Sequence, residues 1–151
     1  MFEFRKLCKM AEQMDPATYS VVVTEKSVKI LAGLALLYES GVDAAKIYLS
    51  FILTAIAADG KLDESEYSLI RPMLEKAVGK EVSYDDAKAI FVEMGLDKPA
   101  GIKNVVDEMV DILGMISAEL KADIIIVCLL VCAIDGKVSA KEKKWIKQLI
   151  R

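Results

Sequence analysis

The residues most suited to chemistry are carboxylates that recur at matching positions in two copies of a short phrase. The first copy, residues 59–66, reads Asp-Gly-Lys-Leu-Asp-Glu-Ser-Glu, and the second, residues 135–142, reads Asp-Gly-Lys-Val-Ser-Ala-Lys-Glu. Carboxylate oxygens are the ligands that Ca²⁺, Mg²⁺ and Mn²⁺ prefer, so a divalent cation is the cofactor that these residues would hold if the two phrases met in the fold. The candidate metal ligands are Asp59, Asp63, Glu66, Asp135 and Glu142.

Helix capping is the alternative explanation of the same phrases. A glycine after an apolar helical run ends the helix, and Asp63 or Ser139 then caps the next one. Glu66 and Glu142 follow their caps by three residues and would complete a capping box in each copy. Capping explains the leading aspartates less well, because a carboxylate at a helix C-terminus faces the negative end of the helix dipole. The residues alone leave both interpretations open.

Each phrase lies between an apolar stretch and an amphipathic one, which indicates a repeated helix–turn–helix unit. The two apolar stretches are residues 47–58 and 124–134. Both are shorter than the roughly 20 residues that span a bilayer. We therefore expect two helices buried inside a bundle rather than membrane spans.

The other segments also show apolar residues at helical spacing, so the expected fold is an all-α, single-domain bundle of seven to eight helices. Two apolar central helices would be wrapped by amphipathic helices. The chain would divide into N-terminal helices (1–42), repeat one (43–79, capped by Asp43), connecting helices (80–117) and repeat two (118–151).

One short segment departs from the helical pattern. Residues 19–24, Tyr-Ser-Val-Val-Val-Thr, have the β-branched composition of a strand. No second strand candidate exists to pair with them, so we expect either an extended connector or the start of the next helix.

The composition excludes several classes of function. The chain contains no histidine, which removes His-based acid–base catalysis and the Ser-His and Cys-His nucleophiles. It also lacks a phosphate-binding loop, so we expect no enzyme activity and no organic cofactor. The net charge of −3 gives no basic surface for nucleic acid. No apolar signal core follows the first residues, which favours a cytoplasmic protein.

The cysteines are an odd number with no zinc-like grouping: Cys8, Cys128 and Cys132. Cys128 and Cys132 share one face of the most apolar helix. Free cysteines are often fully buried, so small buried hydrophobes are the favoured interpretation. The alternative is a thiol site for a soft metal or a chalcogen oxyanion.

Taken with the apolar helices that precede them, the two phrases resemble the signature of the tellurite-resistance TerB-like family. The matching segments are residues 57–66 and 132–142. The N-terminal module of some DnaJ-type membrane co-chaperones is similar. The resemblance covers roughly residues 43–151, and Ser139 departs from it where the first copy has Asp63.

The resemblance implies an all-helical, non-enzymatic, cytoplasmic module for stress or tellurite resistance, in which acidic residues bind a divalent cation. By position these residues are Asp59, Glu66, Asp135 and Glu142. It also implies association with membrane-linked partners at the inner face of the membrane. The alternative is a purely structural module for protein–protein interaction or oligomerisation, with the acidic phrases serving only as caps. The hydrophobic fraction of 54% favours a protein partner or a homo-oligomer.

Overall fold

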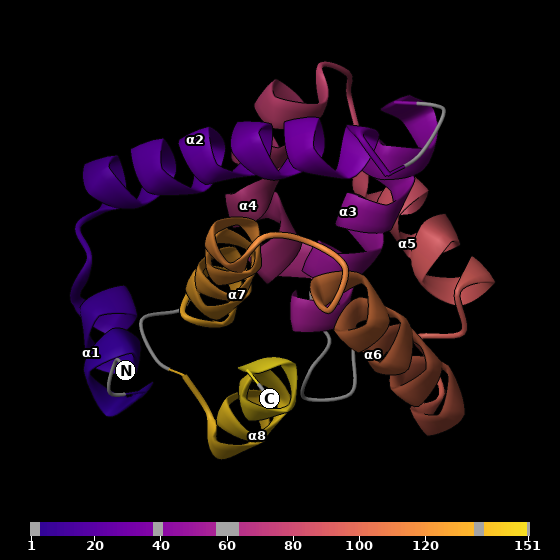
Figure 1. Ribbon diagram of the computed structural model, residues 1–151. Helices are drawn as coiled ribbons and strands as arrows, with labels where there is room; N and C mark the ends of the chain where they lie inside the picture. Colours follow the sequence, from indigo (N-terminus) through magenta and orange to yellow (C-terminus); the bar gives the residue numbers. More distant parts are fainter. Residues whose placement is uncertain (1–3, 38–40, 57–63, 135–137, 151) are drawn as a thin grey trace.

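Eight α-helices account for most of the described chain. The computed structural model describes residues 4–37, 41–56, 64–134 and 138–150 (Figure 1). No residue in these ranges belongs to a β-strand, so the predicted all-α fold is confirmed. The helices are α1 (Phe4–Gln13), α2 (Pro16–Ala35), α3 (Gly41–Ile56), α4 (Glu64–Val78), α5 (Tyr84–Glu93), α6 (Pro99–Leu113), α7 (Ala118–Cys132) and α8 (Ala140–Ile150).

The interior of the bundle is built around α3 and α7, the two apolar helices. Every residue from Tyr48 to Ile56 in α3 is buried, as is every residue from Asp123 to Cys132 in α7 except the half-buried Ile126. In Figure 1, α2 crosses above α7, and α8 lies below it. The predicted pair of apolar helices inside amphipathic ones is therefore confirmed. None of the described helices is both long and apolar enough to cross a membrane.

The helix boundaries follow the internal repeat. The first helix of each unit ends at Ile56 in α3 and at Cys132 in α7, and the second begins at Glu64 in α4 and at Ala140 in α8. Both pairs of positions have the 76-residue offset that separates the two acidic phrases. The sequence repeat is therefore also a repeat of two consecutive helices.

The β-branched residues 19–24 lie inside α2, so the helical alternative is the correct one. Asp15 caps the helix by accepting a hydrogen bond from the Thr18 N–H at 2.9 Å. One turn later the Tyr19 hydroxyl donates a hydrogen bond to the carbonyl oxygen of Leu130 in α7. Burial against α7 thus overrides the strand propensity of this run, which is a weak local preference.

Side-chain caps fix the ends of several connecting helices. Ser83 and Asp86 form a complete capping box at α5, and Ser117 caps α7. The cap predicted at Asp43 is wrong, because α3 already begins at Gly41. The start of α3 is less sharply defined by the sequence, because glycine and aspartate are both favoured at the N-terminus of a helix.

The turn between α5 and α6 depends on two glycines that lie against each other. Gly95 has a φ of 73°, a left-handed conformation that side chains rarely adopt. A Cβ atom at Gly101 would overlap the backbone of Gly95, including its carbonyl oxygen. The missing side chain at Gly101 therefore lets α6 pack directly onto the preceding turn.

Candidate functional site

Two of the five predicted metal ligands can be placed in the fold. Glu66 lies in the first turn of α4 and Glu142 in the first turn of α8, and both side chains are half-buried. The other three, Asp59, Asp63 and Asp135, lie outside the described residues.

Glu142 is part of a capping box, as predicted for the second copy of the phrase. The backbone N–H of Ser139 donates to Oε1 of Glu142 at 2.8 Å, and the N–H of Glu142 donates to Oγ of Ser139 at 3.1 Å. This reciprocal pair satisfies two backbone donors at the start of α8. The corresponding box of the first copy would use Asp63 and lies outside the described part of the chain.

Cys132 brings the two repeats together. Its thiol donates to the carbonyl oxygen of Ala55 at 3.6 Å, so the last turns of α3 and α7 lie side by side. Burial raises the pKa of the Cys132 thiol well above its ordinary value, and the nearby charges of Glu142 and Glu66 raise it further. The two glutamates occupy equivalent positions of the repeat, and both lie close enough to the Cys132 thiol for their charges to raise its pKa.

A third carboxylate, Glu12 of α1, lies at the second turn and was missed by the sequence reasoning. Its Oε2 accepts a hydrogen bond of 2.8 Å from the backbone N–H of Val138. The two residues are 126 positions apart, and nothing local to either one signals the pairing. Burial is the main reason that the pKa of the Cys8 thiol is raised, and the negative charge of Glu12 raises it further.

The surroundings of Cys132 are therefore rich in negative charge. Glu66 and Glu142 lie near its thiol, and the C-terminal ends of α3 and α7 add the negative ends of two helix dipoles. Within the described ranges, however, no three acidic or thiol side chains are grouped so that they could hold a metal ion. A complete cation site at this end of the bundle would need ligands from residues 57–63 or 135–137.

The cysteines fit the interpretation as small buried hydrophobes. All three are free and buried. Burial raises the pKa of Cys128 to about 12, so its thiol stays protonated and unreactive at neutral pH.

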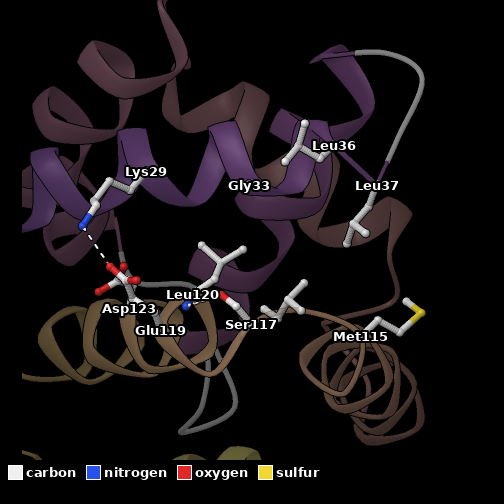
Figure 2. Close-up of a pocket in the computed structure, with 10 residues that line it drawn as sticks. Lys29, Gly33, Leu36, Leu37, Met115, Ser117, Glu119, Leu120 and Asp123 are labelled. Atoms are coloured by element: carbon white, nitrogen blue, oxygen red, sulfur yellow. Dashed lines mark hydrogen bonds and ion pairs between the residues drawn. The ribbon is translucent and has the colours of Figure 1, made fainter.

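A groove of about 370 Å³ lies between the end of α2 and the start of α7 (Figure 2). Leu36, Leu37 and Met115 line it and are 88%, 42% and 66% exposed. Figure 2 shows these three residues at one end, while the ion pair between Lys29 and Glu119, with an N–O distance of 3.6 Å, lies at the other. We refer to it as the α2–α7 groove.

The wall of the α2–α7 groove depends on Gly33. A Cβ atom at Gly33 would overlap the side chain of Leu120, which points from α7 toward α2 in Figure 2. The sequence shows the apolar Leu36-Leu37 pair but gives no sign that both remain exposed, because exposure depends on how α2 meets α7.

Comparison with protein-family models, curated proteins and solved structures finds no match to this chain. The likeness to the TerB-like family therefore rests on the two acidic phrases and the helices around them.

Proposed function

We propose that the chain is a non-enzymatic module that binds a divalent cation between its two repeated turns, within a stress response of the TerB-like type. The observation that carries the proposal is that Glu66 and Glu142, at equivalent positions of the repeat, both lie close to Cys132. By the family resemblance, the module would work in the cytoplasm beside membrane-linked partners.

Electrostatics supplies the physical reason for a cation. The carboxylates of Glu66 and Glu142 lie in the first turns of α4 and α8, whose dipoles favour them, but also near Cys132 at the C-terminal end of α7, where the helix dipole is negative. Negative charges that share this end of the bundle repel one another, and a bound cation would remove this repulsion. Asp59 and Asp135 are the natural additional ligands, because each directly follows the apolar stretch of its repeat. Oxygen ligands of this kind select Ca²⁺, Mg²⁺ or Mn²⁺.

Thermal unfolding of chelator-treated protein, with and without millimolar Ca²⁺, Mg²⁺ or Mn²⁺, tests the proposal. At free metal about 100-fold above Kd, binding should stabilise the fold by roughly 2.7 kcal/mol. In a chain of this length that corresponds to an increase in Tm on the order of 5–10 °C. Indifference of the wild-type Tm to all three metals would sink the cation proposal.

A matched pair of double variants locates the effect. Asp59→Asn with Asp135→Asn removes two charges from the repeated turns and should abolish most of the metal-dependent rise in Tm. Asp97→Asn with Glu108→Gln removes two charges from exposed positions outside the turns and should leave the rise intact. Equal metal responses in the two double variants would place any cation elsewhere.

A second candidate function, self-association, is favoured by the exposed apolar side chains of the α2–α7 groove. Leu36 alone is 88% exposed, and burying such a side chain is favourable. The groove also carries both charge signs, Lys29 and Glu119, so it does not repel a second copy by net charge. Light scattering over a wide concentration range should then show a dimer that Leu36→Glu disrupts. Leu69→Glu, at an exposed leucine of α4, is the control and should leave the dimer unchanged.

A further inference from the structure

A larger groove lies between α6 and α8, with a volume of about 770 Å³. Its apolar lining comes from Ile102 and Val106 of α6 and Trp145 of α8. Val106 and Trp145 are buried and Ile102 is half-buried, so the apolar surface is recessed. We call this feature the α6–α8 groove.

The α6–α8 groove is elongated. On α8 its lining residues run from Lys141 to Gln148, and on α6 from Pro99 to Asp107, in each case at helical spacing. Each helix therefore contributes about two turns, or roughly 10 Å of groove length at 1.5 Å per residue. This shape suits an extended or helical occupant better than a compact one.

Positive charge lines both sides of the groove. Lys103 on α6 and Lys141 and Lys144 on α8 are exposed, and within the described chain none of the three forms an ion pair. Lys147 also lines the groove, but its Nζ lies 5.4 Å from the ring centroid of Phe4 in α1. Among the described residues that line the groove, Asp107 is the one carboxylate. An occupant with acidic side chains would therefore be attracted to this groove.

Trp145 is the aromatic residue that lines the groove. Its side chain is 5% exposed, and its Nε1 is the only buried side-chain nitrogen or oxygen in the described ranges without a hydrogen-bond partner. Buried donors are nearly always satisfied in folded proteins. The Trp145 ring therefore lines the groove from a buried position, and its N–H is an unsatisfied donor in the described chain.

We propose that the α6–α8 groove binds an acidic amphipathic segment of a partner protein, in the manner of a helix laid in a groove. The segment would place apolar residues against Val106 and Trp145, and its acidic residues would face Lys103 and Lys144. A membrane surface fits less well, because insertion needs protruding apolar side chains and none of the exposed large hydrophobic residues belongs to α8. Cation binding plays no part in this proposal.

Trp145 is the only tryptophan in the chain, so its fluorescence reports directly on the groove. The probe is a synthetic 18-residue helical peptide with leucine at helical spacing and glutamate elsewhere, titrated in the presence of a chelator. The expected result is a saturable change in Trp145 emission. A second peptide with lysine in place of glutamate should give no change.

Charge reversal on the two walls tests the site. Lys103→Glu combined with Lys144→Glu should weaken binding of the acidic peptide at least tenfold. Lys88→Glu, at an exposed lysine of α5, should leave it unchanged. Circular dichroism of each variant checks that the helices remain folded. These outcomes together support the proposal.

Three outcomes would overturn it: no emission change with the acidic peptide up to millimolar concentration, equal affinity for both peptides, or equal weakening by Lys88→Glu. Vesicles of phosphatidylserine and phosphatidylcholine and a short duplex DNA complete the comparison. Binding to either of these with no binding of the acidic peptide would assign the lysines to a lipid or nucleic-acid surface and would also reject the proposal.

Discussion

Nζ of Lys26 in α2 lies 2.7 Å from Oδ1 of Asp123 in α7, and only 9% of the Asp123 side chain is exposed. Asp123 is the last charged residue before the apolar run of α7, so this ion pair lies at the edge of the core. Together with the Tyr19–Leu130 hydrogen bond and the exposed Lys29–Glu119 ion pair, it joins α2 to α7 and restricts how the two helices can slide along each other.

Replacing Asp123 with Asn should lower the free energy of unfolding by about 1–3 kcal/mol. Loss of one partner from a fully buried pair costs about 3–5 kcal/mol, but Lys26 is 27% exposed and keeps part of its hydration. Urea denaturation measures the change. The control is Glu119→Gln, which breaks the exposed Lys29–Glu119 pair and should cost less than about 1 kcal/mol. If both variants lost the same free energy of unfolding, the burial of Asp123 would add nothing to the stability that its ion pair provides.

Alanine substitutions at two glycines of α6, one inside the helix and one at its C-cap, should have different effects. Gly101→Ala should destabilise the protein by about 1–3 kcal/mol, because the new Cβ meets backbone atoms of Gly95 that cannot move independently. Gly114→Ala should be neutral or stabilising by up to about 1 kcal/mol, since its φ is −75° and the nearest atom is 3.4 Å away. Thermal unfolding of both variants checks the prediction. A stable Gly101→Ala protein would mean that α6 does not pack on this turn.

The buried thiols should resist alkylation in native protein at pH 8 and react only after unfolding. Because burial raises the pKa of Cys128 to about 12, the folded protein keeps this proton where the unfolded chain, with a thiol pKa of about 8.5, loses it. Stability should therefore fall as the pH rises from about 8.5 toward 12, and less so in Cys128→Ala. Mass spectrometry after iodoacetamide treatment gives the first readout. Rapid modification of folded protein would instead revive a thiol site.

Glu75 should make stability sensitive to acid. The hydrogen bonds that its carboxylate accepts from Arg71 Nε and from the backbone N–H of Val82, each 2.8 Å long, hold the pKa of Glu75 below its ordinary value. The resulting stability is present above the unfolded pKa of about 4.3 and is lost as the pH falls through the lower folded pKa. Glu75→Gln should therefore be less stable than wild type at pH 7, and the difference should shrink at pH 3. A difference that is independent of pH would rule out the charge as its cause.

Structure that local signals specify could be predicted from the sequence. The Asp-Gly-Lys phrases gave the ends of α3 and α7 and the starts of α4 and α8 to within a few residues, because apolar spacing and turn residues act over one or two helical turns. The capping boxes at Ser83 and Ser139 are local in the same way. The run at residues 19–24 stayed ambiguous because its helical state depends on burial against α7.

Features that depend on distant parts of the chain could not be predicted. Glu12 pairs with the N–H of Val138 across 126 positions, and Lys26 pairs with Asp123 across 97. Of the candidate ligands, Glu66 and Glu142 could be predicted as repeat partners, but their shared neighbour Cys132 could not. The two grooves were also missed, because a groove is set by the spacing between helices and not by the pattern within one.

The bond between Tyr19 and Leu130 joins residues 111 positions apart, and this has a consequence for the newly made chain. A ribosome adding about 5–20 residues per second needs on the order of 5–20 s to make α7 after α2 has been made. Throughout that interval α2, whose buried residues include Val23 and Ile30, lacks its contact with α7, while α3 and α4, which also pack on α2, are made sooner. The packing of α2 on α3 and α4 can therefore form before α7 exists, and its contact with α7 is completed later.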